Sequence, residues 1–147
     1  MKAIPEFPTD LDQLRSFLDA DGATKLPGLM GVEIVEVGPS RSRTRMSIES
    51  KHLAPNGYLH AASVIALADS AAGYGCVASL PDGATGFTTI EFKANFLRTL
   101  LEGAMTAEAT LVHGGRTTQI WDSVVTAEAD SKVLALFRCT QLILYPR

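Results

Sequence analysis

The chain has 147 residues, 46% of them hydrophobic and 20% charged, and its formal net charge is −3. This length predicts one domain over residues 1–147 that can bury a core, with a helical extension over residues 1–27. The acidic balance argues against a basic surface that binds nucleic acid. Two isolated cysteines, Cys76 and Cys139, form neither a disulfide framework nor a metal-ligand cluster, so we expect no metal.

The first helix is expected to begin at residues 8–10, with Thr9 as its cap, and to end near Gly22. Residues 23–30 are expected to be a loop. Residues 32–37 and 41–50 have the pattern of two strands joined by a turn, which predicts a β-hairpin.

A long apolar stretch follows at residues 61–80 and predicts a helix that is buried on most sides. Its length would suit a membrane span, but it contains Asp69 and two glycines and is rich in alanine and serine, so a core helix is favoured. The first residues lack the apolar run of a signal peptide. We therefore expect a soluble cytoplasmic protein with no membrane partner.

Four strands are predicted after this helix, and the first of them has Ile90, Phe92, Ala94 and Phe96 on one half-buried face. The four ranges are 86–97, 104–113, 117–128 and 132–144. An antiparallel sheet can hide one apolar helix by curling around it. The side of the helix that the sheet leaves open calls for a second subunit.

Asp69 is the one charged residue in the apolar stretch. A carboxyl group buried without a charged partner has a raised pKa, and general bases and nucleophiles are often built from such groups. The alternative is a structural aspartate that bonds to the backbone or to a nearby hydroxyl such as that of Ser70. The position alone leaves both interpretations open.

His60 stands at the predicted start of the helix, nine residues before Asp69. That spacing places Asp69 roughly 12–13 Å along the helix axis and on a different face. If both residues act on one atom, they come from different subunits of a two-fold dimer with antiparallel helices. The Ala61 N–H is unpaired at the positive end of the helix and is a candidate donor to a developing oxyanion.

Three segments resemble the signature of the hotdog-fold acyl-CoA thioesterases of the phenylacetate-degradation and 4-hydroxybenzoyl-CoA type. They are residues 55–62 (PNGYLHAA), residues 66–69 (ALAD), and the strand and turn over residues 92–103. The resemblance covers about residues 28–145. It implies an α+β hotdog fold, in which a curved antiparallel sheet wraps around one long apolar helix, here with a short N-terminal helix.

The resemblance also implies roles for particular residues. Asp69 is the nucleophile or general base, and the backbone N–H that follows His60, that of Ala61, polarises the thioester carbonyl. Thr89 aligns with a hydroxyl residue that supports the acid. Asn56 is the candidate for the amide that places substrate or water.

The chain departs from the family pattern at three places. Ala61 and Ala62 replace a pair of glycines, and Thr99 replaces a proline. The family's Asn or Gln lies six residues before the histidine, where this chain has Ala54.

Basic residues offer weaker predictions. Lys93, Arg98 and Arg116 are candidates to bind the phosphates of coenzyme A, with Arg98 favoured because it lies in the turn where the family often makes such contacts. The alternating arginines between residues 41 and 45 are better explained as a solvated strand face. His52 and His113 are expected on the surface.

The leading hypothesis is a thioesterase that hydrolyses a small or aromatic acyl-CoA, as a homodimer or a tetramer of dimers. Coenzyme A is then part of the substrate, and no separate cofactor is expected. The alternative is a non-catalytic acyl-CoA-binding dimer with the same fold. A hotdog hydratase is disfavoured, because the paired histidine and acid motifs of that branch are missing.

Overall fold

The computed structural model describes residues 6–147, so the first five residues of the predicted extension lie outside it. Within that range the chain forms helices and one antiparallel sheet. In chain order the elements are α1 (Leu11–Gly22), α2 (Leu26–Met30), β1 (Glu33–Gly38), β2 (Arg41–Ser47), a 3-10 turn (Ser50–His52), α3 (Ala61–Ala78), β3 (Gly86–Phe96), β4 (Ala104–Gly114), β5 (Thr118–Ala127) and β6 (Val133–Leu144).

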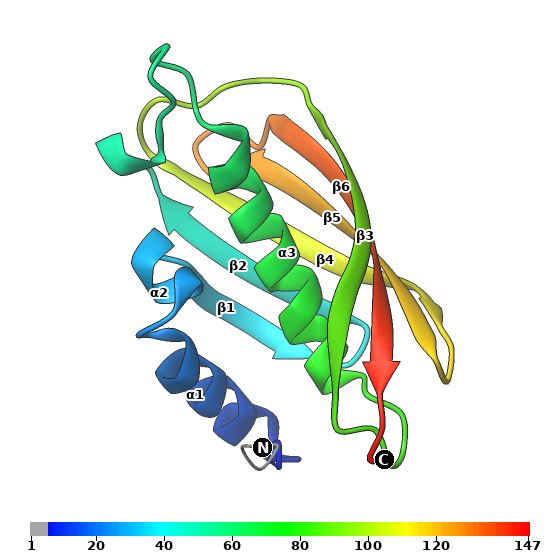
Figure 1. Cartoon of the computed structure of the whole chain (residues 1–147). Coiled ribbons are helices and arrows are strands. Elements are labelled where there is room, and N and C mark those ends of the chain that lie inside the picture. Colours follow the sequence, from blue (N-terminus) through cyan, green and yellow to red (C-terminus); the bar gives the residue numbers. More distant parts are fainter. Residues whose placement is uncertain (1–5) are drawn as a thin grey trace.

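The six strands are hydrogen-bonded in the order β1-β2-β4-β5-β6-β3, and every neighbouring pair is antiparallel. The sheet curves around α3, which lies along its concave face (Figure 1). The predicted hotdog fold and the β1–β2 hairpin are therefore confirmed. Strands β1 and β3 form the two edges, so the strand that follows the long helix has one side without a partner strand in this chain.

Hydroxyl groups of the sheet hold α3 in place. Ser42 and Thr44 of β2 donate to the carbonyl oxygens of Ala71 and Leu67, and Ser123 of β5 donates to a third helix carbonyl at 2.9 Å. All three side chains are buried. Such bonds need a close approach of helix and sheet, and the alanines and glycines of α3 permit that approach because they leave little side-chain volume between the two backbones.

At Gly75 the helix α3 approaches a side chain of the sheet very closely. A Cβ atom at this position would lie 2.6 Å from two ring carbons of Trp121, which is fully buried. We expect Gly75→Ala to lower the free energy of unfolding by about 2 kcal/mol, because overpacking outweighs the gain in helix propensity. Chemical denaturation at fixed protein concentration measures the change.

Gly73→Ala is the matched control in the same helix. Its added Cβ would meet the tip of the Phe87 ring at 3.0 Å, and Phe87 is only half-buried and can shift. Both substitutions gain the same helix propensity, so their difference isolates the contact with Trp121. Equal stability of the two variants would contradict the prediction.

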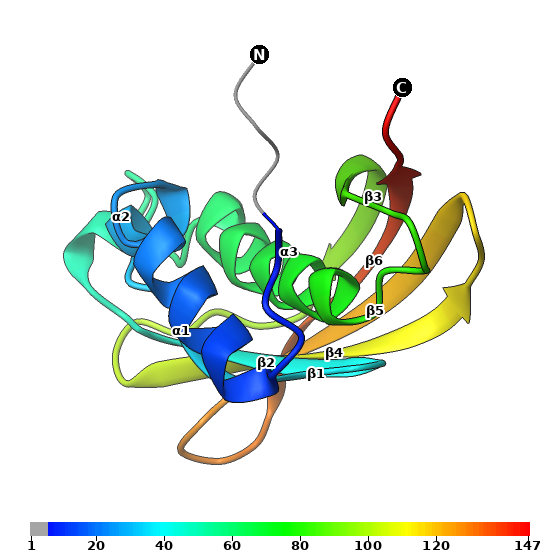
Figure 2. The ribbon, with the colours of Figure 1, turned by 90° about the horizontal axis from the view of Figure 1, so that it is seen from below.

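The N-terminal region differs from the sequence-based expectation in two details. The cap of α1 is Asp10 rather than Thr9, because the Asp10 carboxylate accepts a hydrogen bond from the Gln13 N–H at 2.9 Å. The expected loop over residues 23–30 contains the short helix α2. Figure 2 shows α1 and α2 beside α3 on the concave side of the sheet, next to β1 and β2. The N-terminal helices thus cover the β1 side of α3 and leave the β3 side uncovered.

A β-bulge at Ile90 interrupts the alternation of β3. The ladder pairs Thr89 with Gln141 and then Glu91 with Thr140, so Ile90 has no partner. The predicted common face for Ile90 and Phe92 is therefore wrong. The extra residue places Thr89 and Phe92, three positions apart, on the helix side of the sheet, whereas a regular strand would turn them to opposite faces.

Of the described residues, one helix, α3, is long and apolar enough to pass for a membrane span. It passes by length and composition only, as the core helix of a soluble protein also does. Nine of its residues are buried, and its sheet-facing residues belong to the main hydrophobic core.

Candidate active site

The start of α3 presents an unused backbone donor. His60 is the N-cap of the helix, and its Nδ1 accepts the N–H of Ala62 at 2.9 Å. In the part of the chain that the structure describes, the N–H of Ala61 makes no hydrogen bond. Both residues are exposed, and the helix dipole adds positive potential there. The Ala61 N–H can therefore donate to an oxygen that gains negative charge.

His52 fixes the chain just before this helix. It was expected on the surface, but it is fully buried. Its Nδ1 accepts the Glu49 N–H at 2.9 Å, so its Nε2 carries the proton and donates to the Met30 carbonyl at 2.8 Å. Its own carbonyl accepts from the His60 N–H and the Ser63 hydroxyl. His113 is exposed, as expected.

Asp69 lies on the side of α3 that faces β3. Burial raises the pKa of its carboxyl group above the ordinary value. The hydroxyl that contacts it is that of Thr89, whose Oγ1 lies 3.3 Å from Asp69 Oδ1, and within the described residues no hydrogen bond joins Asp69 to the Ser70 hydroxyl. No salt bridge to Asp69 forms among residues 6–147. The structure thus brings Thr89 to the carboxyl group of Asp69.

Gln141 completes this cluster and was not singled out from the sequence. It lies opposite Thr89 in the β3–β6 ladder, is fully buried, and places its Oε1 2.8 Å from Thr89 Oγ1. A glutamine among the apolar residues of a strand is an unusual choice, and that is the sequence signal that could have found it.

The two ends of the candidate site do not meet within one chain. His60 and Asp69 are separated by nine residues of continuous helix, which amounts to roughly 13 Å along its axis. Asn56 lies on an exposed turn before the helix, where its Oδ1 accepts the Tyr58 N–H at 3.2 Å. Its side chain therefore stabilises that turn in the isolated chain.

The three candidate phosphate ligands lie in different places. Arg98 lines an apolar hollow of about 420 Å³ beside Ala61, and its guanidinium also donates to the Val133 carbonyl at 3.0 Å. Lys93 lies on the outer face of the sheet near Arg138. Arg116 stacks over the Tyr145 ring near the opposite end of α3. One chain therefore does not gather them into one phosphate site.

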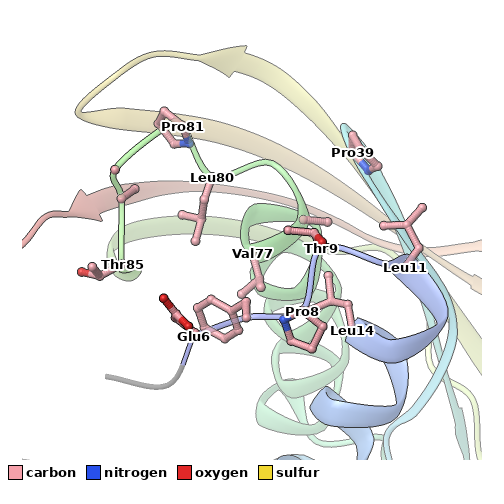
Figure 3. Close-up of a pocket in the computed structure, with 14 residues that line it drawn as sticks. Glu6, Pro8, Thr9, Leu11, Leu14, Pro39, Val77, Leu80, Pro81 and Thr85 are labelled. Carbon is pink, nitrogen blue, oxygen red and sulfur yellow. The ribbon is translucent and has the colours of Figure 1, made fainter. Parts of the chain in front are cut away.

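A cavity of about 630 Å³ lies at the far end of α3 (Figure 3). Its walls are the segment before α1, the end of α3 near Val77, and the loop from Leu80 to Thr85. None of the candidate catalytic residues lines it. In residues 6–147, no three His, Cys, Asp or Glu side chains are grouped as metal ligands.

The Thioesterase superfamily model matches residues 56–134, a range that contains the helix start, Asp69 and Thr89. The chain belongs to this superfamily. It is 34% identical over 111 residues to a 1,4-dihydroxy-2-naphthoyl-CoA hydrolase of Listeria monocytogenes, which covers 76% of this chain and 89% of that protein. Like that hydrolase, this thioesterase superfamily member is an enzyme that hydrolyses thioesters.

Two solved structures have the same architecture. A mutant thioesterase from Pseudomonas aeruginosa superposes with a TM-score of 0.81 at 27% identity, covering 97% of this chain and 96% of that one. A mutant phenylacetic acid degradation protein from Thermus thermophilus gives 0.73 at 24% identity, over 80% and 97% of the two chains. At 24% identity, the similarity to the Thermus thermophilus protein shows a shared fold alone.

Proposed function

We propose that this thioesterase cleaves a small or aromatic acyl-CoA at a site shared by two chains. One chain supplies the helix start, with His60 and the Ala61 N–H, and the other supplies Asp69. The observation that carries the proposal is the free N–H of Ala61. It lies about two helical turns from Asp69, which has the one carboxyl group of the helix. A single chain cannot bring both to one thioester.

The uncovered side of the molecule supports a second copy. The β3 edge has no neighbouring strand, and large apolar side chains gather on and near it. Those at least 46% exposed are Ile90, Phe92, Phe96, Leu97 and Leu101. Exposed apolar edges favour association, and a two-fold axis beside α3 would set the two helices antiparallel. The proposed assembly is a homodimer, or a tetramer built from such dimers.

The proposed reaction is an acyl transfer to water. The thioester carbonyl oxygen accepts the Ala61 N–H, which stabilises negative charge as the carbonyl carbon is attacked. Asp69 either attacks that carbon itself or takes a proton from the attacking water. With water as the nucleophile, the carbon–sulfur bond breaks and coenzyme A leaves as a thiol with the proton from the water. With Asp69 as the nucleophile, coenzyme A leaves as a thiolate and a mixed anhydride forms, which water then cleaves to the free acid and the Asp69 carboxylate while its proton passes to the thiolate. Arg98, at the rim of the hollow beside Ala61, is the favoured contact for the phosphates of coenzyme A.

The acyl class is the part of the proposal that a substrate panel tests. The hollow beside Ala61 is lined largely by apolar side chains, among them Tyr58, Leu59, Val64 and Phe96. We expect purified protein to release free thiol fastest from aromatic or short acyl-CoA thioesters. A preference for long acyl chains would overturn the assignment of the acyl class, and no release from any member would overturn the site.

A shared site predicts that two inactive variants restore activity when mixed. Asp69→Asn and Ala61→Pro are combined at equal amounts under conditions that allow subunit exchange. Half of the dimers are then mixed, and each contains one site with both defects and one site with neither. About a quarter of the wild-type activity should return, if the two sites act independently. Confirmed exchange without recovered activity would show that the helix start and Asp69 of different chains do not form one site.

A further inference from the structure

The Thr89 hydroxyl lies between two oxygen atoms but has one proton to donate. Its Oγ1 is 2.8 Å from Gln141 Oε1 and 3.3 Å from Asp69 Oδ1. Both distances admit a hydrogen bond from the Thr89 hydroxyl, and a bond to Asp69 would lower the pKa of that carboxyl group. The contact with Gln141 has the usual hydroxyl-to-oxygen length of about 2.5–3.0 Å, whereas the contact with Asp69 is longer and weaker. The hydroxyl proton therefore belongs to the bond with Gln141.

The buried environment of Gln141 fixes which end of its amide faces Thr89. Its Nε2 donates to the Sγ of Cys139 at 3.3 Å, which leaves Oε1 directed at the hydroxyl. Gln141 and Thr89 are direct partners in the β3–β6 ladder, and Gln141 has no exposed surface. The pair therefore cannot separate without disturbing two strands.

We infer that Gln141 is a positioning residue, which accepts the Thr89 proton and thereby turns an oxygen lone pair of Thr89 toward Asp69. This inference rests on the proposed role of Asp69. A lone pair repels an ionised carboxylate and accepts a hydrogen bond from a protonated carboxyl group. The arrangement thus favours the protonated form of Asp69 and makes the ionised form a stronger base or nucleophile.

The other groups around Asp69 add no charge that competes with this effect. Burial raises the pKa of the Asp69 carboxyl group. From β6, the Cys139 thiol faces it, and burial raises the pKa of that thiol to about 12, so it is neutral. Cys76 of α3, close to Cys139, has a pKa raised to about 12 by burial as well. From β3, Thr89 is the polar neighbour, and Glu91 acts on Cys139.

The opposite proton direction has the opposite consequence. If the Gln141 amide were turned, its Nε2 would donate to Thr89, and the hydroxyl proton would go to Asp69. That donation would lower the pKa of the Asp69 carboxyl group. The sign of the change on removal of Gln141 therefore separates the two arrangements.

The test is Gln141→Met, because methionine is unbranched and adaptable enough to fill the buried space without a strong hydrogen-bond acceptor. The freed Thr89 proton then donates to Asp69, and the pKa of the carboxyl group falls. We expect the acid limb of the kcat-against-pH profile to move about one unit lower. The carboxyl carbon of Asp69, followed by NMR during a pH titration, should shift its midpoint in the same direction.

Two further variants control for structural damage. Gln119→Met changes a glutamine that is equally buried in the neighbouring strand but bonds to Ser79 and Trp121, so it should leave the acid limb in place. The double variant of Thr89→Val with Gln141→Met should match Thr89→Val alone, because Gln141 acts through Thr89.

A midpoint that stays in place or rises in Gln141→Met overturns the inference. If Gln141→Met does not fold, the midpoint of Thr89→Val decides: a clear rise would show that Thr89 donates to Asp69 and would overturn the inference, whereas an unchanged or lower midpoint supports it. The NMR midpoint reports on Asp69 whether or not it is catalytic. Full activity of Asp69→Asn would therefore refute the proposed function and leave this test intact.

Discussion

Asp69→Asn is expected to lower kcat by at least about 10²-fold, which is the usual loss when a general base is removed. The amide keeps the shape of the side chain but can neither take a proton nor attack the thioester carbon as a carboxylate does. Hydrolysis of the best acyl-CoA substrate, followed through the released thiol, measures the effect. Asp82→Asn, in the exposed turn after α3, is the matched control and should keep wild-type activity.

The same substitution should not weaken the fold. Because burial raises the pKa of Asp69, the folded protein binds a proton more tightly than the unfolded chain does. The resulting stabilisation is complete below the unfolded pKa, near 3.8, and is lost as the pH rises through the folded pKa. Above the folded pKa of Asp69, the buried ionised carboxylate destabilises the fold. At neutral pH, Asp69→Asn should therefore unfold at the same temperature as the wild type or at a higher one. A strong loss of stability with full activity in the remaining folded protein would make Asp69 structural.

Ala61→Pro removes the backbone N–H that is the proposed oxyanion donor and should leave the helix α3 in place. Proline lacks the N–H and is favoured at the first position of a helix. His60 already has the extended conformation that a following proline requires, with φ −69° and ψ 133°. We expect kcat to fall by about 10²- to 10³-fold, the loss seen when one oxyanion donor is removed. Thiol release under saturating substrate measures it.

Ala61→Val is the matched control, because it adds a side chain of similar size and keeps the N–H. It should therefore lose much less activity than Ala61→Pro. An equal loss in both variants would show that the space at Ala61 matters and that its N–H does not act as the donor. Circular dichroism of both proteins establishes that α3 is retained.

The regular elements of this chain could be read from local patterns. Alternating apolar residues marked the strands, and the apolar stretch around Asp69 marked α3 within two residues of its observed end. Strand alternation and an unbroken apolar stretch are both features that a segment carries in its own sequence. The histidine-to-acid spacing and the strand that follows pointed to the thioesterase family in the same way.

Contacts between distant segments decided what the local patterns could not. Regular strand alternation would place Ile90 and Phe92 on one face. The bulge at Ile90 instead places Phe92 on the same face as Thr89, which lies beside Asp69. His52 looks like a surface residue in its polar loop, yet the carbonyl of Met30 from α2 holds it in the interior.

The sequence by itself determined the fold class, the helix that carries Asp69, and the unpaired N–H at its start, because each depends on residues close together in the chain. Only the tertiary structure decided that Gln141, fifty-two residues from Thr89, receives its proton. Strand pairing brings such residues together, and the direction of a shared proton then depends on differences of a few tenths of an ångström that no sequence pattern records.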